Sequence, residues 1–214
     1  MALTFYYGAG SPYAWRVWLA LEYKGIPFDL RLLSFAAGDL KQPEYAAINP
    51  RRKVPAIVDD GFALYESAAI LEYLDECYDE PPLLFPGDLR QRALIRRMVR
   101  EADQYAANAL EELVDAILYT NPAEWDDAAI ERSRDALARE LATWETMIAG
   151  EWLAGPLSAA DFTLYPIIAL ALRLDRKKPE LDVRGRIGPQ LGAWMGRIES
   201  LPYFAHTWPS HWTS

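Results

Sequence analysis

The sequence predicts a protein of two domains, an N-terminal α/β domain followed by an all-helical domain. In the first third of the chain, short apolar runs of strand length alternate with runs that repeat at helical spacing. A proline-rich stretch at residues 79–88 interrupts this pattern, and beyond it the apolar residues recur only at helical spacing. We therefore expect an α/β domain over residues 1–78, a linker over 79–88 and a helical-bundle domain over 89–214.

Strands and helices alternate in the predicted first domain. In order, they are a strand at 3–7, a helix after Ser11-Pro12, a strand at 28–32, a short helix before residue 49, a hairpin of strands at 54–58 and 62–65, and a helix from about Glu66 to Tyr78. Serine before proline signals a helix start, because serine can cap the helix and proline fits its first turn. Asp60-Gly61 favours a tight hairpin, because both residues tolerate positive φ. The apolar stripe of the last helix places Cys77 in the core.

The helical domain is predicted from two long apolar stripes. One extends through residues 94–117 and the other through 130–148, with a break at Asn121-Pro122 between them. A further helix begins at Ser158, where Asp161 lies at the position that completes a capping box. We expect this carboxylate to have a structural role.

Composition excludes several classes of function. Lys and Arg number 22 against 31 Asp and Glu, and the net charge of -9 would repel phosphate backbones, so no nucleic-acid partner is expected. No apolar run is long enough for a signal peptide or a membrane span, which favours a cytoplasmic protein with no membrane partner. One cysteine and two histidines are too few for a structural zinc site, and no metal is expected. Both histidines, His206 and His211, lie near the end of the chain, where a loosely held tail is more typical than a catalytic base.

Ser11 is the first residue with a chemical interpretation. Its hydroxyl and the positive end of the helix that it begins could together stabilise a bound thiolate. Helix capping alone is the simpler interpretation of Ser11-Pro12 taken by itself. The wider sequence context favours the thiolate.

Two further loops carry binding groups. Val54-Pro55 opens a strand, and a cis bond there would turn the Val54 backbone outward to pair with an extended peptide, whereas a trans proline would only start the strand. Glu66-Ser67 begins a helix directly after a strand, so the helix amides and the Ser67 hydroxyl can bind a carboxylate while Glu66 binds an ammonium group. Lys41 and residues 51–53 add local positive charge that could attract a second carboxylate.

Three segments in this order resemble the cytosolic glutathione transferase superfamily. They are Ser11–Val17, Asn49–Ala56 and Tyr65–Leu74, and Ser158–Asp161 also resembles a helix cap of that family's second domain. The resemblance extends over essentially the whole chain. It implies a thioredoxin-like first domain that binds glutathione as co-substrate, a helical second domain that lines the site for a small hydrophobic electrophile, and a homodimer.

The resemblance also implies how glutathione is held. The residues of the implied glutathione site are Lys41, Lys53, Val54, Pro55, Glu66 and Ser67. Pro55 would be cis, and Val54 would pair with the cysteinyl backbone of glutathione. Glu66 and Ser67 would hold the γ-glutamyl end, and Lys53 would lie near the glycyl carboxylate. Ser11 would activate the thiol as in the serine-type members, with Tyr6 or Tyr7 as alternatives.

Four residues are predicted to line the electrophile pocket, namely Tyr13, Tyr105, Tyr119 and Arg173. Tyrosine rings can stack on flat apolar substrates. Trp15-Arg16-Val17 is similar to the zeta class, whose members include maleylacetoacetate isomerases, and Arg173 follows Asp161 at the spacing of an arginine that lines their pocket. Pro12-Tyr13 departs from that class, which has Ser-Cys at this position.

Different functions share this predicted site. Addition of the glutathione thiolate to a hydrophobic electrophile is the first. An isomerase or a peroxidase would use the same thiolate on another substrate. A non-catalytic binding or interaction protein of the same fold is the alternative outside enzymes, since a fold does not fix a function.

Overall fold

The computed structural model describes residues 3–212, which form two compact units. One unit contains the described chain up to Gly87 together with the segment from Pro202 onward. The other extends from Asp88 to Leu201. The segment from Pro202 onward was assigned to the helical domain from the sequence, and in the structure it groups with the α/β unit.

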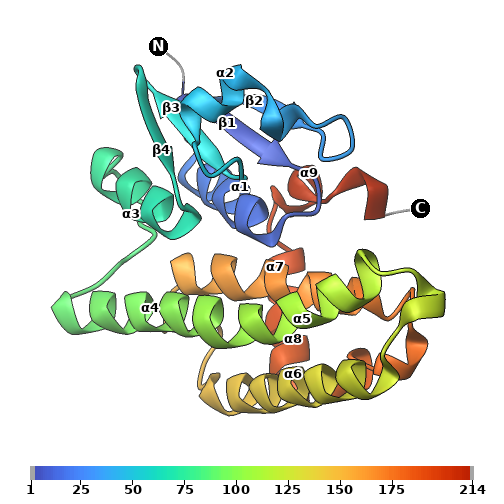
Figure 1. The fold of residues 1–214 in the computed structure, drawn as a ribbon. Coiled ribbons are helices and arrows are strands. Elements are labelled where there is room, and N and C mark those ends of the chain that lie inside the picture. The colour runs from blue at the N-terminus through green and yellow to red at the C-terminus, as the bar shows by residue number, and fades with distance from the viewer. Residues whose placement is uncertain (1–2, 213–214) are drawn as a thin grey trace. The chain divides into compact units, whose positions relative to one another are not determined.

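The α/β unit is built on a four-stranded sheet (Figure 1). Its strands are β1 (Leu3–Gly8), β2 (Phe28–Leu33), β3 (Ala56–Asp59) and β4 (Phe62–Tyr65), in the order β2-β1-β3-β4. Strand β1 is parallel to β2 and antiparallel to β3, and β3 is antiparallel to β4. The predicted hairpin is confirmed, with Asp60 and Gly61 at φ of 46° and 84°.

Helices cover both faces of this sheet. They are α1 (Pro12–Lys24), α2 (Pro43–Ile48) and α3 (Ser67–Cys77), with a 3₁₀ turn η1 (Asp39–Lys41) before α2. Successive strand residues point to opposite faces. On β1, Phe5 and Tyr7 therefore pack on Trp18 of α1, whereas Tyr6 packs on Tyr45 of α2. A βαβ unit followed by a hairpin and a helix is the thioredoxin-like arrangement that the resemblance implied.

Two buried charged residues tie the chain beyond α3 to the α/β unit. Lys24 Nζ lies 3.4 Å from Asp75 Oδ1, and their side chains are 1% and 6% exposed. The Asp75 carboxylate accepts the backbone N–H groups of Leu84 at 2.5 Å and Phe85 at 3.0 Å. Lys24 also donates to the carbonyl oxygen of Pro82 at 2.9 Å. Most of the stretch that the sequence marks as a linker is therefore fixed to the first unit.

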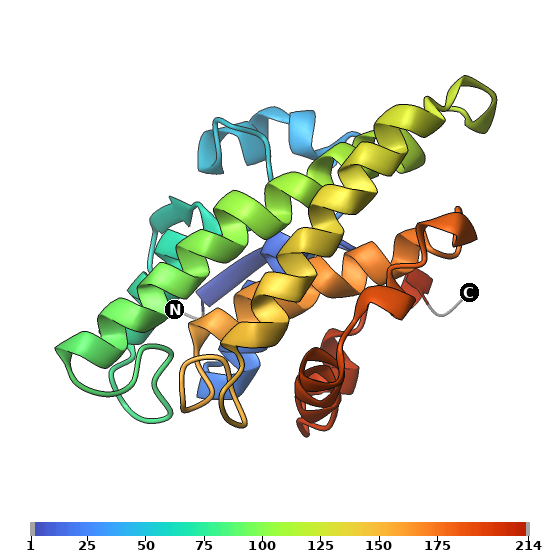
Figure 2. The ribbon, with the colours of Figure 1, turned by 90° about the horizontal axis from the view of Figure 1, so that it is seen from below.

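The second unit is all-helical. Its helices are α4 (Leu89–Glu101), α5 (Ala107–Leu118), α6 (Asp127–Met147), α7 (Ala159–Leu174) and α8 (Pro189–Glu199), with 3₁₀ turns η3 (Pro122–Glu124), η4 (Pro179–Leu181) and η5 (Arg184–Arg186). A π-helical turn η2 (Ala102–Ala106) joins α4 to α5, so these follow one continuous path with α6 alongside α5 (Figure 2). Helix α7 is buried over most of its length and contacts α4, α5 and α8.

Helix α7 begins in the capping box that the sequence predicted. The Asp161 side chain is fully buried, and its Oδ2 accepts from the Ser158 N–H at 2.9 Å and from the Ser158 hydroxyl at 3.1 Å. Its Oδ1 accepts from the Leu153 N–H at 3.0 Å and from Trp194 Nε1 at 2.8 Å. Burial raises the pKa of Asp161, and these four hydrogen bonds act in the opposite direction. One carboxylate thus joins the start of α7 to the preceding loop and to α8.

The prediction that Cys77 lies in the core is wrong, because its side chain is exposed. Cys77 is the last residue of α3, beyond Ile70, Leu71 and Leu74, which fill the core. Helical spacing identifies the face on which a residue lies. It does not show how far along that face the neighbouring elements extend.

The C-terminal segment, residues 202–212, is docked rather than loosely held, which corrects the expectation for this tail. It contains α9 (Phe204–Thr207) and a 3₁₀ turn η6 (Ser210–Trp212). The buried Trp15 of α1 donates its indole N–H to Thr207 Oγ1 at 2.8 Å. The Trp15 ring lies 5.9, 5.4 and 5.5 Å from the rings of Phe204, Trp208 and Trp212. We call these four rings the aromatic cluster.

We predict that Asp161→Ala destabilises the helical unit by about 3 kcal/mol or more, because four buried or partly buried donors lose their acceptor. Urea-induced unfolding, monitored by circular dichroism, measures this loss in the free energy of unfolding. Asp127→Ala is the matched control, since Asp127 is 76% exposed and bonds only at the surface to Lys178, and it should cost less than about 1 kcal/mol. Equal losses in both variants would contradict the structural role of Asp161.

Candidate functional site

Ser11 caps α1 just beyond the carboxyl end of β1. Its Oγ accepts the N–H of Ala14 at 3.3 Å, and its own N–H donates to the carbonyl oxygen of Gly8 at 3.1 Å. A hydroxyl that accepts at its oxygen still has its O–H to donate. Ser11 is partly exposed, and α1 has 13 residues, so the positive end of the helix dipole lies at an accessible hydroxyl. Ser11 can therefore cap α1 and donate a hydrogen bond to a thiolate at the same time.

The hydroxyls of Tyr6 and Tyr7, the alternatives to Ser11, are less suitable as hydrogen-bond donors to a thiolate. Tyr7 is 3% exposed, its hydroxyl oxygen accepts the N–H of Gly10 at 3.4 Å, and burial raises its pKa to about 12. Tyr6 points to the opposite face of the sheet, where its ring packs 5.6 Å from that of Tyr45. Both tyrosines are thus engaged in packing on either side of β1.

The loop before β3 is fixed by side chains from α2 and its end. The carbonyl oxygen of Lys53 accepts from the Tyr45 hydroxyl at 2.5 Å and from Asn49 Nδ2 at 2.7 Å. Asn49 is buried, and its Oδ1 accepts the N–H of Arg51 at 2.9 Å. The Val54-Pro55 bond is cis, as the resemblance implied. Within residues 3–212, the Val54 N–H and C=O have no backbone hydrogen-bond partner, so they are available to a ligand.

The loop before α3 carries an unusual backbone conformation. Glu66 has φ of 71°, which residues other than glycine seldom adopt, and such conformations are concentrated at binding sites. Arg52, in the loop before β3, has φ of 55°. The Glu66 side chain is exposed, as are those of Lys41 and Lys53, whereas Ser67 is 4% exposed at the start of α3.

Arg16 is a site residue that the sequence analysis did not identify. It is 3% exposed on α1, and its Nη2 donates a short hydrogen bond to the Ser67 hydroxyl oxygen. Its guanidinium carbon also lies 5.4 Å from the centre of the Tyr13 ring. The available signal was an arginine inside the apolar sequence Trp15-Arg16-Val17, because a buried charge needs a partner. This guanidinium adds positive potential beside the N-terminus of α3.

The sheet topology brings the three loops to one edge. Tyr6 pairs with Ala56, and Ala56 pairs with Tyr65. Since β3 is antiparallel to both β1 and β4, the end of β1, the start of β3 and the end of β4 meet at this edge. The loops that leave it carry Ser11, Val54 and Glu66. A Cβ at Gly8 would lie 2.8 Å from Val54 Cγ2, so the glycine lets the Val54 loop approach β1 closely.

The predicted electrophile residues occupy separate positions. Tyr105 is 51% exposed in the π-helical turn η2, and Tyr119 is 80% exposed at the end of α5. The 14 positions between them correspond to roughly 20 Å along the helical path, so a small substrate can contact at most one of the two. Arg173 lies in the last turn of α7, where burial and the charge of Arg176 lower its pKa. Tyr13 lies in the first turn of α1.

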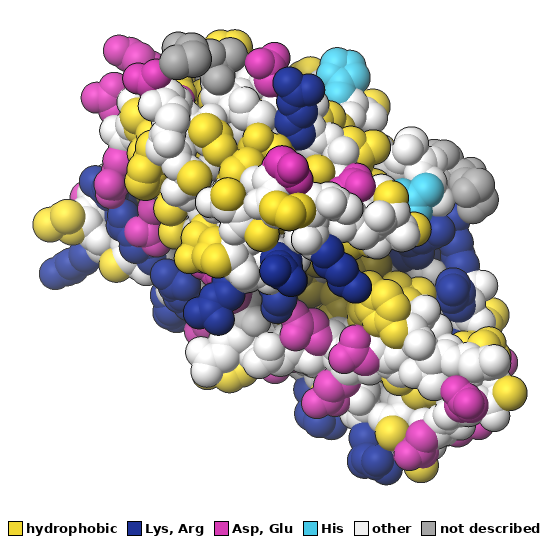
Figure 3. Space-filling view, turned by 45° about the horizontal axis from the view of Figure 1, so that its top comes forward, with side chains coloured by type: hydrophobic (Ala, Val, Ile, Leu, Met, Phe, Trp, Pro, Cys, Tyr) yellow, Lys and Arg dark blue, Asp and Glu magenta, His cyan; other side chains and the backbone are white. Residues whose placement is uncertain are grey.

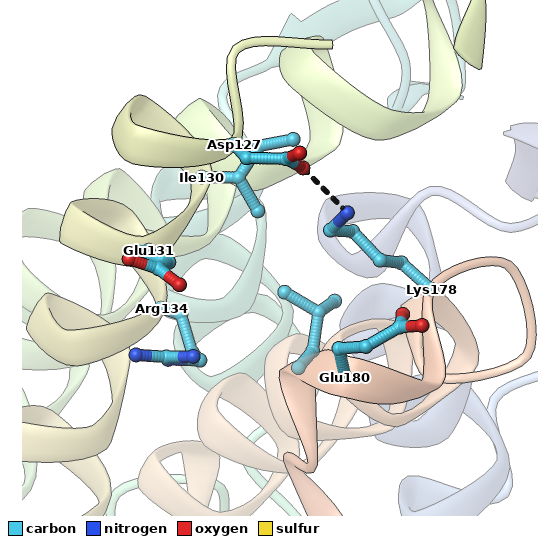
Figure 4. A pocket seen from close by; sticks show the side chains of 7 residues that line it. Asp127, Ile130, Glu131, Arg134, Lys178 and Glu180 are labelled. Atoms are coloured by element: carbon cyan, nitrogen blue, oxygen red, sulfur yellow. Dashed lines mark hydrogen bonds and ion pairs between the residues drawn. The ribbon is translucent and has the colours of Figure 1, made fainter.

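A surface pocket of about 310 Å³ lies on the helical unit, between α6 and η4 (Figure 4). Its lining residues are Asp127, Ile130, Glu131, Arg134, Lys178, Glu180 and Leu181. Lys178 Nζ lies 2.8 Å from Asp127 Oδ1 and 4.6 Å from the centre of the Trp125 ring. Charged groups that pair with one another line this pocket, and it holds none of the predicted site residues.

Between residues 3 and 212, no three His, Cys, Asp or Glu side chains gather closely enough to hold a metal ion. In the same range, no helix combines the length and apolar character needed to cross a membrane.

The fold and the site together define a class of protein. It has a thioredoxin-like domain with a serine at the start of the first helix, a cis-proline loop and a helix N-terminus at the same sheet edge, and a helical domain after it. Comparison with known proteins places this chain within that class. The model of the glutathione S-transferase N-terminal domain matches residues 10–77, and that of the C-terminal domain matches residues 127–197.

Individual relatives agree with these matches. Glutathione S-transferase A of Pleuronectes platessa is 29% identical, over 98% of this chain and 92% of its own length. Probable maleylacetoacetate isomerase 2 of Drosophila melanogaster is 31% identical, over 94% of this chain and 85% of its own length. A glutathione transferase crystal structure from Burkholderia graminis, with two glutathione molecules bound per subunit, is 25% identical with a TM-score of 0.85, over 96% of this chain and 87% of that one. The chain belongs to the glutathione S-transferase family; the serine-type and zeta-like features stay predictions.

We predict that Asn49→Ala loosens the loop that presents Val54, because it removes the bonds to the Lys53 carbonyl and the Arg51 N–H. Stability should fall by about 2 kcal/mol, the sum of two hydrogen bonds of about 1 kcal/mol each. Thermal unfolding and equilibrium binding of glutathione measure the two effects. Asn108→Ala, at an exposed position of α5, should leave both unchanged. Unaltered binding in a destabilised Asn49→Ala protein would separate this loop from the binding site.

Proposed function

We propose that this protein activates the thiol of glutathione at Ser11 for attack on a hydrophobic electrophile. The observation that carries this proposal is the sheet edge at which the loops of Ser11, Val54 and Glu66 meet. A tripeptide with an acidic end, a central thiol and a further carboxylate has one group for each of these loops. Glutathione has this chemistry, and the family membership supports it.

Binding follows from the groups that each loop offers. The Val54 N–H and C=O pair with the cysteinyl backbone in the manner of an added strand. The N–H groups at the N-terminus of α3 and the Ser67 hydroxyl donate to the γ-glutamyl carboxylate, while Glu66 binds the ammonium group. Arg16 fixes the Ser67 hydroxyl, whose oxygen accepts from the guanidinium and whose proton remains for the carboxylate. Lys41 and Lys53 supply positive charge for the glycyl carboxylate.

Activation needs a lower thiol pKa. A free thiol has a pKa of about 8.5, and lowering it by about two units corresponds to roughly 2.7 kcal/mol. A hydrogen bond to a charged group contributes about 1.5–3 kcal/mol, and a helix N-terminus about 0.3–1 kcal/mol. Ser11 and the start of α1 supply both, so their sum reaches the required magnitude. The thiolate then acts as the nucleophile.

The electrophile itself stays a prediction. Tyr13, Tyr105, Tyr119 and Arg173 remain the proposed contacts, and the π-helical turn favours Tyr105, because such turns are frequent at functional sites. The relative named as a probable maleylacetoacetate isomerase supports glutathione-dependent isomerisation as a second candidate function. A cytoplasmic homodimer is part of the same proposal. Failure to bind glutathione would favour the non-catalytic alternative.

We predict that Ser11→Ala and Ser11→Gly both raise the pKa of the bound glutathione thiol by about one to two units, because both remove the hydroxyl and leave the helix N-terminus in place. The two variants differ in stability, since alanine at a helix cap costs about 1 kcal/mol and glycine only a few tenths. Ultraviolet titration of the thiolate and thermal unfolding measure the two properties. A thiolate signal that persists unchanged in folded Ser11→Gly would exclude Ser11 as the activator and direct attention to Tyr6 and Tyr7.

We predict that Glu66→Gln weakens glutathione binding about 10-fold, because an uncharged amide replaces the partner of the ammonium group. Isothermal titration calorimetry gives the Kd. Glu76→Gln is the matched control, since Glu76 is also exposed and lies near the end of α3, the helix that Glu66 precedes. If both substitutions change the Kd equally, the effect comes from net charge and the specific contact is refuted.

A further inference from the structure

The C-terminal segment reaches the turn between β1 and α1. The aromatic cluster holds this segment on α1, and the rings of Trp208 and Trp212 also contact each other at 5.7 Å. Trp212 is 3% exposed, whereas His211 beside it is exposed. Both histidines of the chain lie at the surface, as Figure 3 shows. Docking therefore buries Trp212 and leaves the imidazole rings of His206 and His211 exposed.

His211 lies against the residue that precedes Ser11. A Cβ built on Gly10 would lie 3.1 Å from both Cε1 and Nε2 of His211, and 3.2 Å from Nε1 of Trp212. Gly10 has φ of +85°, so this turn adopts a conformation that suits glycine and has no side chain to separate it from the imidazole. His211 therefore lies beside the residue that immediately precedes the proposed thiolate donor Ser11 in the chain.

The other groups at this turn are poorly suited to donate a proton. Tyr7 is buried, its oxygen already accepts from Gly10, and its pKa is raised to about 12. Ser11 and the helix N-terminus serve the sulfur in the proposed mechanism. Imidazole is the side chain that exchanges protons near neutral pH, and the His211 ring is exposed at this position.

We propose that His211 donates a proton to the oxygen of electrophiles in which the attacked carbon is conjugated to a carbonyl group. This inference rests on the proposed transferase function. It identifies α,β-unsaturated carbonyl compounds as the substrate class, because their addition develops negative charge on an oxygen that an imidazolium can protonate. An aryl halide instead delocalises the charge into its ring and substituents, and gains little from this donor.

The proposed step is a conjugate addition followed by protonation of the oxygen. A sulfur lone pair of the thiolate forms the bond to the β-carbon, the C=C pair moves to the bond between the α-carbon and the carbonyl carbon, and the C=O π pair moves to oxygen. The imidazolium proton of His211 is transferred to that oxygen and gives an enol. The enol then tautomerises through solvent, and solvent returns a proton to the imidazole. The proton released when glutathione ionised equals the proton gained, so the net reaction adds a thiol across an alkene.

We predict that His211→Ala lowers kcat with benzylideneacetone, an enone, by about 10-fold to 100-fold, the value of a hydrogen bond to a developing charge. Turnover of chlorodinitrobenzene and the pKa of the bound thiol should stay unchanged. His211→Gln keeps an N–H donor without a transferable proton. Its kcat with benzylideneacetone should lie between the values of the wild type and of His211→Ala. His206→Ala is the matched control, since His206 is exposed on the same segment and should behave as the wild type with both substrates.

Proton NMR provides a readout independent of turnover. The chain has two histidines, and addition of glutathione should shift the imidazole signals of His211 while leaving those of His206 in place. Equal losses with both electrophiles, unchanged kcat with both, or a His211 signal that ignores glutathione would each overturn the proposal. Wild-type protein that binds no glutathione would refute the transferase function itself, and this outcome is visible before any variant is compared.

Discussion

The buried indole of Trp15 fixes the start of α1 and the end of the chain against each other. Its N–H needs a partner because it is buried, and Thr207 provides one at 2.8 Å. Its ring lies at the centre of the aromatic cluster, where each aromatic pair contributes about 0.5–1.5 kcal/mol beyond the area it buries. The backbone N–H of Trp15 also donates to the carbonyl oxygen of Ser11 at 2.9 Å. Both Ser11 and the segment that carries His211 are therefore bonded to the same residue, Ser11 through its backbone and the segment through its side chain.

Strand direction determines the rest of the site. Residues far apart in the sequence meet because β3 is antiparallel to both of its neighbours, so that loops from three strands leave one edge. In the proposed site, backbone groups would supply much of the binding chemistry, namely the Val54 amide and the N-termini of α1 and α3. Backbone groups held by a sheet lose little conformational freedom when a ligand binds.

Buried charges divide into two groups by their surroundings. Asp161 and the Lys24–Asp75 pair are surrounded by hydrogen-bond partners of the fold, so their role is to join elements. Arg16 is also buried, but its hydrogen bond goes to Ser67 at the start of a helix in the proposed binding site. In a chain with a net charge of -9, Arg16 thus places a positive charge beside the proposed site of an anionic peptide. The same burial that makes a charge costly makes its field strong at a nearby ligand.

The sequence by itself determined the two-domain order, the strand and helix types, the caps at Ser11 and Ser158, and the family. Those features are local, since hydrophobic period, capping residues and Asp-Gly turns act over a few positions. Cys77 shows where such local patterns fail. Its helical spacing predicted a buried side chain, but the elements packed against α3 do not extend to its last residue, so Cys77 is exposed. Only the tertiary structure decided that Arg16 bonds Ser67 and that His211 lies against Gly10, contacts that span 51 and 201 positions of the chain. Such contacts depend on how distant elements pack, and no local pattern in the sequence carries that information.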